Sequence, residues 1–289
     1  MRETFWKRLV QGAVRVRARP NWARFAGPDW PERIMHVPVT DRFHAKQGRS
    51  IGRWVLQAEG EQLVVYLKRH YRLPWWRGLL GTVCPDAGWS PAFHEWDHLE
   101  WARTQGFAVP RAVASGEYIG PWGRLQSFLA VEELTGMLPL HQAIPAAAAC
   151  LDGRAFARWK RGLAAEIARL ARALHRRRWF HKDLYLCHFY IAREDTECLP
   201  AWRGRVRLID LHRLGRHRWT WRWWQLKDLA QLLYASDLPQ ISDRDRLYFW
   251  RAYREATDRG HFARWLVRAI RMKAARYRRH NAKRRRSTP

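Results

Sequence analysis

Three features are scarce in this sequence of 289 residues: long apolar runs, paired cysteines and acidic side chains. No run of about 18 apolar residues occurs, so no transmembrane helix is predicted. The basic segment 1–20 lacks an uninterrupted apolar core, so no signal peptide is predicted either. The four cysteines have neither CxxC pairing nor metal-ligand spacing, which predicts reduced thiols in the cytoplasm (Cys84, Cys150, Cys187 and Cys198).

Acidic residues are outnumbered, because 26 Asp and Glu stand against 54 Lys and Arg, a formal net charge of +28. Such a charge favours an anionic partner, whether a nucleic acid, an anionic lipid surface or a phosphorylated substrate. Most of the positive residues are arginine, and an arginine-rich composition can also reflect the genome. No nucleic-acid-binding motif accompanies the charge, so no specific nucleic-acid partner is expected.

Hydrophobic periodicity divides the chain into a strand-rich part and a mostly helical part. Residues 1–41 carry helical and loop signals and are interpreted as an N-terminal extension. Residues 42–134 predict a strand-rich N-lobe, residues 135–278 a mostly helical C-lobe, and residues 279–289 a basic tail. The predicted fold class is therefore α+β in two lobes.

Two helices are marked most clearly. The first has Ser90 as its N-cap and Gly106 after its last turn. The second carries apolar residues at steps of 3, 4, 4, 3 and 4 from Phe156 to Leu174, which is one face of an α-helix. Before the first helix, a turn at Glu59–Glu61 leads into the strand-forming run LVVYLK.

Four charged residues occur in the order that phosphoryl transfer requires. Lys68 lies on a predicted N-lobe strand, and Glu95 lies on the helix that follows. Asp183 lies in the loop after the long helix, and Asp210 ends the strand RVRLID. A lysine neutralises nucleotide phosphates and a glutamate holds that lysine. One aspartate orients the acceptor hydroxyl, and the other binds the metal that bridges the phosphates. The set predicts a two-lobed, protein-kinase-like fold with a nucleotide-binding N-lobe.

Several segments resemble the lipopolysaccharide kinase family, whose members phosphorylate heptose or Kdo sugars of the core. The resemblance covers roughly residues 42 to 255, and its specific segments are HKDLYLCHFYI, LIDLHRL, KDLAQLLYAS, YLKRHYRLPWWRGLL and FHEWDHLEWARTQGFAVP. It implies that Lys68 contacts ATP phosphates, that Glu95 pairs with Lys68, and that Asp183 is the catalytic aspartate. It also implies that Asp210 binds metal.

Further site residues follow from the same resemblance and from its departures. Glu132 and Glu133 would lie near the adenine hinge. No GxGxxG motif is present, and the segment from Gly48 to Gly52 is interpreted as the turn over the phosphates. No segment ending in Ala-Pro-Glu follows Asp210-Leu-His, and a peptide substrate usually needs that platform. A small or lipid-linked acceptor is therefore favoured.

His188 stands five residues after Asp183, where protein kinases carry an asparagine that binds a second metal ion. A neutral imidazole can bind metal, although nitrogen suits hard Mg²⁺ less well than oxygen does. Two alternatives remain open: a structural hydrogen bond within the loop, and an imidazolium that holds a substrate phosphate.

Three basic or aromatic segments suggest contacts beyond the catalytic set. The apolar loop expected at residues 73–80 carries two adjacent tryptophans and can either face a bilayer or pack over the N-lobe. The Arg/Trp run at 218–224 can stack on sugars and hold phosphates, or can be structural. The run at 283–286 is either a solvated tail or a contact with anionic lipid.

The function predicted from these observations is an ATP-dependent kinase that phosphorylates heptose or Kdo in the lipopolysaccharide core, or a similar glycolipid. Mg²⁺ is the expected metal, with Mn²⁺ as an alternative. The expected location is the cytoplasm, peripherally on the inner face of the cytoplasmic membrane, with an anionic membrane surface as a partner. The alternatives are a small-molecule or protein kinase of related fold and an inactive kinase fold that serves as a binding module.

Overall fold

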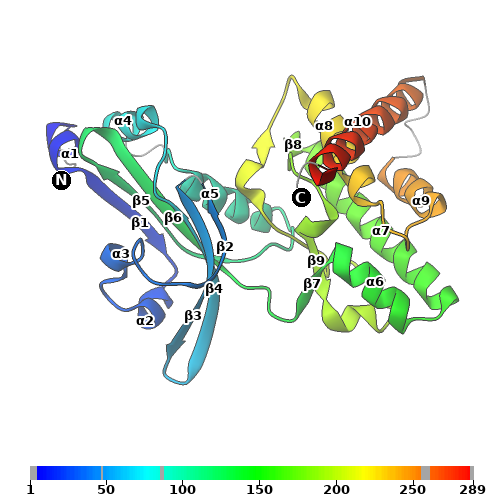
Figure 1. Ribbon diagram of the computed structural model, residues 1–289, viewed down its shortest axis with the longest axis horizontal. Coiled ribbons are helices and arrows are strands. Elements are labelled where there is room, and N and C mark those ends of the chain that lie inside the picture. The colour runs from blue at the N-terminus through cyan, green and yellow to red at the C-terminus, as the bar shows by residue number, and fades with distance from the viewer. Residues whose placement is uncertain (1–4, 47, 85–87, 255–260, 287–289) are drawn as a thin grey trace. The chain divides into compact units, whose positions relative to one another are not determined.

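The computed structural model describes residues 5–46, 48–84, 88–254 and 261–286 (Figure 1). The chain divides between Thr135 and Gly136 into two units, called unit 1 and unit 2 here. Each unit has its own core and is described by itself. Among the described residues, no helix is both long enough and apolar enough to cross a membrane.

Unit 1 is an antiparallel sheet with helices. Its elements are α1 (Phe5–Gln11), β1 (Ala13–Ala18), α2 (Trp22–Ala26), α3 (Trp30–Arg33), β2 (Thr40–Lys46), β3 (Arg49–Ala58), β4 (Glu61–His70), α4 (Trp75–Val83), α5 (Pro91–Thr104), β5 (Ala112–Gly120), the 3₁₀ turn η2 (Pro121–Gly123) and β6 (Arg124–Glu132). The six strands lie in the order β1-β5-β6-β4-β3-β2.

Strand β4 shows how the sheet separates core from site. Successive side chains of a strand point to opposite faces. Val65 and Leu67 therefore share one face, where they pack with the buried tryptophans of α2 and α3. Lys68 points to the other face, where it meets α5. The predicted turn between β3 and β4 is confirmed, with Glu59 and Gly60 both at positive φ.

Helix α5 begins and ends as predicted. The Ser90 hydroxyl accepts the Phe93 N–H at 3.2 Å, and Gly106 takes a φ of +78° after the last turn. Phe93 and Leu99 are buried on the face turned to the sheet. The sequence pattern and the packing thus agree for this helix.

The interpretation of residues 1–41 as a separate extension misses their part in unit 1. Strand β1 pairs along its length with β5 and forms an edge of the sheet. Its valines, Val14 and Val16, are exposed, whereas Arg15 and Arg17 point inward. Arg17 lies over the Phe93 ring at 4.2 Å and pairs with Asp97 at 2.5 Å. The usual apolar-inward alternation is reversed, so the pattern gave no strand signal.

The apolar segment at 73–80 is also not the loop that the sequence predicted. Residues Trp75–Val83 form helix α4, which begins directly after Pro74. Thr82 donates to the Gly78 carbonyl at 3.0 Å within the helix. Gly78 is required there, because a Cβ at this position would lie 1.8 Å from the Gly123 carbonyl oxygen.

Unit 2 is mostly helical. Its elements are β7 (Met137–Pro139), α6 (Leu140–Cys150), α7 (Gly153–Arg176), β8 (Trp179–Phe180), η3 (Leu186–His188), β9 (Phe189–Ala192), η4 (Arg193–Thr196), β10 (Arg207–Leu208), η5 (Leu211–Arg213), β11 (Gly215–Arg216), α8 (Trp221–Ala235), α9 (Asp243–Tyr253) and α10 (His261–Arg286). The short strands form a three-stranded sheet in the order β10-β9-β7 and a two-stranded sheet of β11 and β8.

Helix α7 confirms the periodicity of the sequence, since Trp159, Leu163, Ile167, Leu170 and Leu174 are all buried. Its N-cap is Asp152, whose carboxylate accepts two main-chain N–H groups at 2.8 Å. The apolar stripe is therefore buried along the length of the helix, in the core of unit 2.

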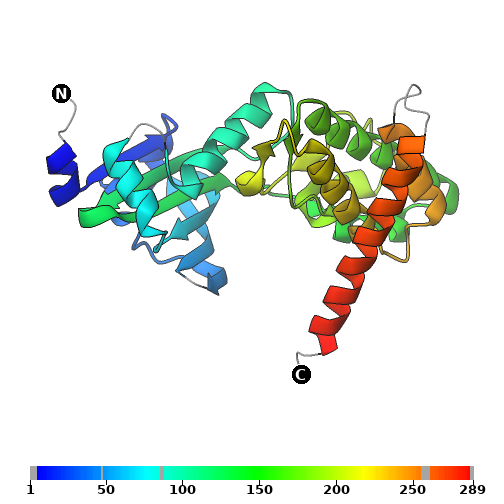
Figure 2. The same ribbon diagram turned by 90° about the horizontal axis from the view of Figure 1, so that it is seen from above.

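The C-terminal part of the chain differs from its prediction. A helix was expected at 262–278 and a tail at 279–289, but α10 runs to Arg286. Figure 2 shows it as one straight helix. The backbone of residues 283–286 is described, but their side chains, which carry the expected lipid contact, are not. The strand expected over RVRLID is also shorter, because only Arg207–Leu208 pair.

Candidate active site

The ion pair predicted in unit 1 is present. Lys68 Nζ donates to Glu95 Oε1 at 2.6 Å, and the Glu95 side chain is buried between α5 and the sheet. A glutamate in this position keeps the lysine extended along the face of the sheet. The pair can therefore present one ammonium group to a nucleotide phosphate. Its role in nucleotide binding stays a prediction.

The two glycines of the predicted phosphate-covering turn lie in different surroundings. Gly48 lies between β2 and β3 and has a φ of +75°, as a tight turn requires. Gly52 lies inside β3, paired with Arg42 on one side and Leu67 on the other. Placing both in one turn was wrong, because the β2–β3 ladder continues through Gly52. A phosphate contact by Gly48 stays a prediction.

The acidic pair at the end of β6 is engaged within unit 1. Arg53 donates to both oxygens of Glu133 at 2.8 and 2.9 Å, and these hydrogen bonds hold the pKa of Glu133 below its usual value. Burial raises the pKa of Glu132, although Arg111 and Arg19 oppose it. Arg53 thus occupies the Glu133 carboxylate. A contact of Glu132 or Glu133 with adenine stays a prediction.

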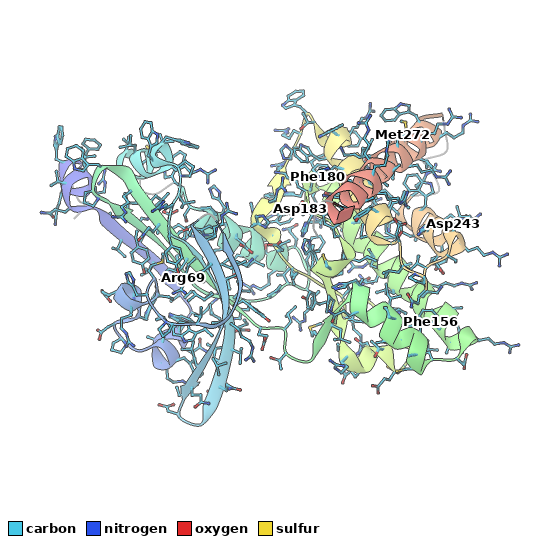
Figure 3. All side chains as sticks on the ribbon, in the orientation of Figure 1. Arg69, Phe156, Phe180, Asp183, Asp243 and Met272 are labelled. Atoms are coloured by element: carbon cyan, nitrogen blue, oxygen red, sulfur yellow. The ribbon has the colours of Figure 1, made fainter. Side chains whose placement is uncertain are left out.

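In unit 2 the Asp183 carboxylate is held by two donors. Arg213 Nη1 lies 2.9 Å from Oδ2 and 3.2 Å from Oδ1, and Gln231 Nε2 lies 3.4 Å from Oδ1. Asp183 is labelled in Figure 3. Both donors hold the carboxylate in a fixed orientation, as a group that positions an acceptor hydroxyl requires.

The loop around Asp183 is fixed by helix α8. Buried Asp228 accepts the main-chain N–H groups of His181 and Lys182 at 2.9 and 2.8 Å. Gln231, one turn later, accepts the Leu184 N–H at 3.0 Å and donates to the Lys182 carbonyl at 3.0 Å. These contacts hold Lys182 at a φ of +69°, which is strained for a lysine.

The sequence interpretation missed the role of Asp228 and Gln231. It read KDLAQLLYAS only as a buried helix and as part of the family resemblance. The usable signal was that two polar residues three apart share one helix face among apolar neighbours. Buried polar groups need partners, and a neighbouring loop supplies main-chain groups.

The two predicted metal ligands lie together. The main-chain carbonyl of Asp183 accepts the His188 Nδ1–H at 2.6 Å. That hydrogen bond leaves Nε2 on the other side of the ring, 3.7 Å from Asp210 Oδ2. Asp210 has a φ of +62°. The loop hydrogen bond and a metal contact are thus compatible, because they use different ring nitrogens.

The donor set fits a divalent ion that keeps other ligands. No cluster of three or more metal-binding side chains occurs within the described ranges. One carboxylate and one imidazole therefore suit an ion that takes its remaining ligands from water and phosphates. Burial lowers the pKa of His188, but the Cys187 side chain, the Asp183 carbonyl and Asp210 together raise it above its ordinary value. A bound cation would compete with that proton.

Two further histidines join this assembly. His181 is fully buried, and its Nε2–H donates to the Ile209 carbonyl at 3.0 Å, which ties the Asp183 loop to the segment before Asp210. Burial lowers the pKa of His181, so the ring is neutral. His212 Nδ1 lies 2.7 Å from Asp210 Oδ1.

The chain is similar in sequence to proteins of known name. The lipopolysaccharide core heptose(I) kinase WaaP of Pseudomonas aeruginosa is 31% identical over 208 residues, which are 70% of this chain and 74% of that protein. The protein of the same name from Escherichia coli is 29% identical over 202 residues, 64% of this chain and 70% of its own.

A solved structure described as WaaP in complex with acyl carrier protein has a TM-score of 0.64 and 26% identity, and the match covers 90% of this chain and 99% of that one. The likeness confirms the predicted α+β, kinase-like fold. Residues 41–253 match the sequence pattern of the lipopolysaccharide kinase (Kdo/WaaP) family. This chain therefore belongs to the lipopolysaccharide kinase (Kdo/WaaP) family.

Proposed function

We propose that the protein transfers the γ-phosphoryl group of ATP to a heptose hydroxyl of the lipopolysaccharide core, in the presence of a divalent metal ion. The named activity of its relatives supports the acceptor. The observation that carries the chemistry is the assembly in unit 2, where Asp228 fixes the loop that presents Asp183 beside His188 and Asp210.

Each residue of the proposed mechanism has one task. Lys68, held by Glu95, neutralises nucleotide phosphates. Asp183 orients the acceptor hydroxyl and receives its proton. The acceptor oxygen then bonds to the γ-phosphorus while the bond to the ADP oxygen breaks. His188 and Asp210 would hold the divalent ion, which would supply charge neutralisation at the phosphates.

The choice between heptose and Kdo is tested with truncated acceptors. The purified chain is incubated with labelled ATP and either a core that contains heptose or a core that ends at Kdo. We expect label only in the heptose-containing core, with the phosphate mapped to heptose by NMR. Equal labelling of the Kdo-only core would contradict the heptose assignment and would indicate a kinase with a different acceptor.

We also propose that unit 1 binds the membrane peripherally through a tryptophan surface formed by Trp6, Trp75, Trp76 and Trp122. These side chains come from α1, α4 and η2, which contact one another at one end of the sheet (Figure 1). Three of them are 67 to 72% exposed. Trp122 stands at the tip of the β5–β6 hairpin with a φ of +58°. Arg77 lies over the Trp76 ring at 5.3 Å.

Tryptophans flanked by arginine suit the headgroup region of an anionic bilayer. Flotation with anionic liposomes tests this surface. The double variant Trp75→Ala/Trp122→Ala is expected to lose most binding, whereas Trp219→Ala, which removes a 94% exposed tryptophan of unit 2, is expected to keep it. Wild-type binding should weaken as salt rises. Equal flotation of all three proteins would contradict the surface.

The solved relative suggests a partner for unit 2. A cavity of about 860 Å³ lies among α7, α8, α9 and α10, lined mainly by apolar side chains such as Leu163, Leu232 and Ile270. The pocket is partly open to solvent, and its apolar lining suits an apolar ligand. We infer that it receives the acyl chain of an acyl carrier protein. Binding of the acylated carrier, but not of the unacylated carrier, would support this; equal binding of both would contradict it.

A further inference from the structure

Two lysine ammonium groups share one indole ring beside the catalytic loop. Lys182 Nζ lies 5.0 Å from the Trp224 ring centroid, and Lys227 Nζ lies 5.2 Å from it. The indole is itself fixed, because it stacks on His217 at 4.8 Å and its N–H donates to Thr220 Oγ1 at 3.1 Å. A rigid aromatic ring therefore carries two positive charges next to Asp183.

A third ammonium group comes from helix α10, which packs on α8. Lys273 Nζ lies 4.4 Å from the Trp223 ring centroid and 5.7 Å from that of Tyr277. Burial lowers the pKa of Lys227, and repulsion from Arg213 and, to a smaller extent, from Lys273 lowers it further, although Asp183 and Asp228 oppose this. Lys182, Lys227 and Lys273, with Trp223, Trp224 and Tyr277, are called the lysine–aromatic cluster below.

The positive charge of this cluster is only partly offset by nearby carboxylates. None of its three lysines forms an ion pair with a carboxylate in the described part of the chain. Nearby Asp183 is occupied by Arg213 and Gln231, and Asp228 by main-chain N–H groups. Burial lowers the pKa of Lys182, and repulsion from Arg213 and Lys227 lowers it further, although the two aspartates oppose this.

The cluster borders the catalytic carboxylate. Lys182 directly precedes Asp183, and Arg213 contacts Asp183 while repelling both Lys182 and Lys227. Burial raises the pKa of Tyr277 to about 12, with smaller contributions from Tyr185 and Asp183. Aromatic faces and ammonium groups thus adjoin the place where an acceptor hydroxyl must lie.

We propose that the lysine–aromatic cluster is the acceptor subsite and binds an acidic group, a carboxylate or a phosphate, carried by the core near the hydroxyl that is phosphorylated. This inference rests on the proposed function and names how its acceptor is recognised. Kdo is a sugar acid, so a lipopolysaccharide core that contains Kdo carries carboxylates, and lysine ammonium groups pair with either kind of anion. The indole and phenol faces provide stacking surfaces for sugar rings.

Part of this subsite lies beyond the residues that match the family's sequence pattern. The family match ends at residue 253, whereas Lys273 and Tyr277 belong to α10. Acceptor recognition therefore draws on a C-terminal helix that carries none of the proposed catalytic residues. Variants in α10 can separate acceptor binding from phosphoryl transfer.

Steady-state kinetics with the full chain and a deacylated heptose–Kdo core test the subsite. Lys273→Gln is expected to raise the acceptor KM about tenfold or more, because one charge-assisted contact is lost. Lys273→Arg keeps the charge and should restore most of the affinity. Arg268→Gln, an exposed change on the same helix, should leave the acceptor KM at the wild-type value.

Modified acceptors identify the acidic group. The wild-type acceptor KM should rise when the bound group is altered, either by esterifying the carboxylates or by removing the phosphates. The acceptor KM of Lys273→Gln should not change with that same modification. The proposal is overturned if Lys273→Gln matches Arg268→Gln, or if its ATP KM rises while its acceptor KM does not. A wild-type chain that phosphorylates no core acceptor overturns the proposed function, and the subsite with it. If wild type phosphorylates the core with a measurable acceptor KM, the variants test the subsite alone.

Discussion

Replacing Asp228 by asparagine tests how the catalytic loop is held. The buried carboxylate accepts N–H groups from His181 and Lys182 with its two oxygens. An asparagine of the same shape keeps one acceptor oxygen but turns an NH₂ group toward the other N–H donor. One hydrogen bond to a charged acceptor is lost, and one buried N–H is left without a partner.

The size of the effect follows from these two losses. A hydrogen bond to a charged group is worth about 1.5–3 kcal/mol, and an unsatisfied buried N–H costs about 1–3 kcal/mol. Asp228→Asn should therefore lower the free energy of unfolding by about 2.5–6 kcal/mol, a large part of the ~5–15 kcal/mol typical of a domain. Because Lys182 relaxes from its strained φ, Asp183 should shift, and kcat should fall about 100-fold.

Urea unfolding followed by tryptophan fluorescence measures the stability, and acceptor phosphorylation measures kcat. The matched control is Asp243→Asn, which removes a carboxylate that is 94% exposed and pairs with Arg246 on the surface. It should cost under about 1 kcal/mol and leave kcat unchanged. If Asp228→Asn behaves like this control, the reasoning about the loop is refuted.

Other expectations follow from the contacts of single residues. Lys68→Ala should lower kcat/KM for ATP strongly, and Glu95→Gln should lower it more mildly. The double variant should lose less than the sum of the two single losses, because the two groups are 2.6 Å apart. Additive losses in kcat/KM would argue against the pairing. Arg69 is 1% exposed and donates to the carbonyls of Ile34, Met35 and Val37. Its change to Leu should cost about 3–5 kcal/mol of unfolding free energy, and an unchanged urea midpoint would contradict this. His188→Asn should shift the metal preference from Mn²⁺ toward Mg²⁺, because an amide oxygen replaces a ring nitrogen; a constant ratio of the two rates would remove His188 from the metal site.

Local signals in the sequence were sufficient where one face of an element is apolar and its ends are capped. Helices α5 and α7 were predicted for this reason, and so was the turn before β4. The spacing of Lys68 and Glu95 also identified two residues that do meet. For the two helices and the turn, the decisive information lies within a few turns of the chain.

The signals failed where distant contacts decide the structure. Strand β1 buries arginines on Phe93 and exposes valines, so its own alternation points the wrong way. Arg69 follows Lys68 in the same strand, yet only its neighbour was chosen, because nothing local shows that carbonyls at 34–37 surround it. Asp228 lies 46 and 47 residues from the two residues whose N–H groups it accepts, Lys182 and His181. Such partners become visible only in the folded chain.

The most direct test of the central claim compares wild type with Asp183→Asn in transfer of labelled phosphate from ATP to heptose-containing core. The variant keeps the size of the side chain but cannot take the acceptor proton. We expect wild type to label heptose and the variant to lose nearly all transfer, while circular dichroism and ATP binding stay close to wild type. Near-normal transfer by Asp183→Asn would contradict the account of this site.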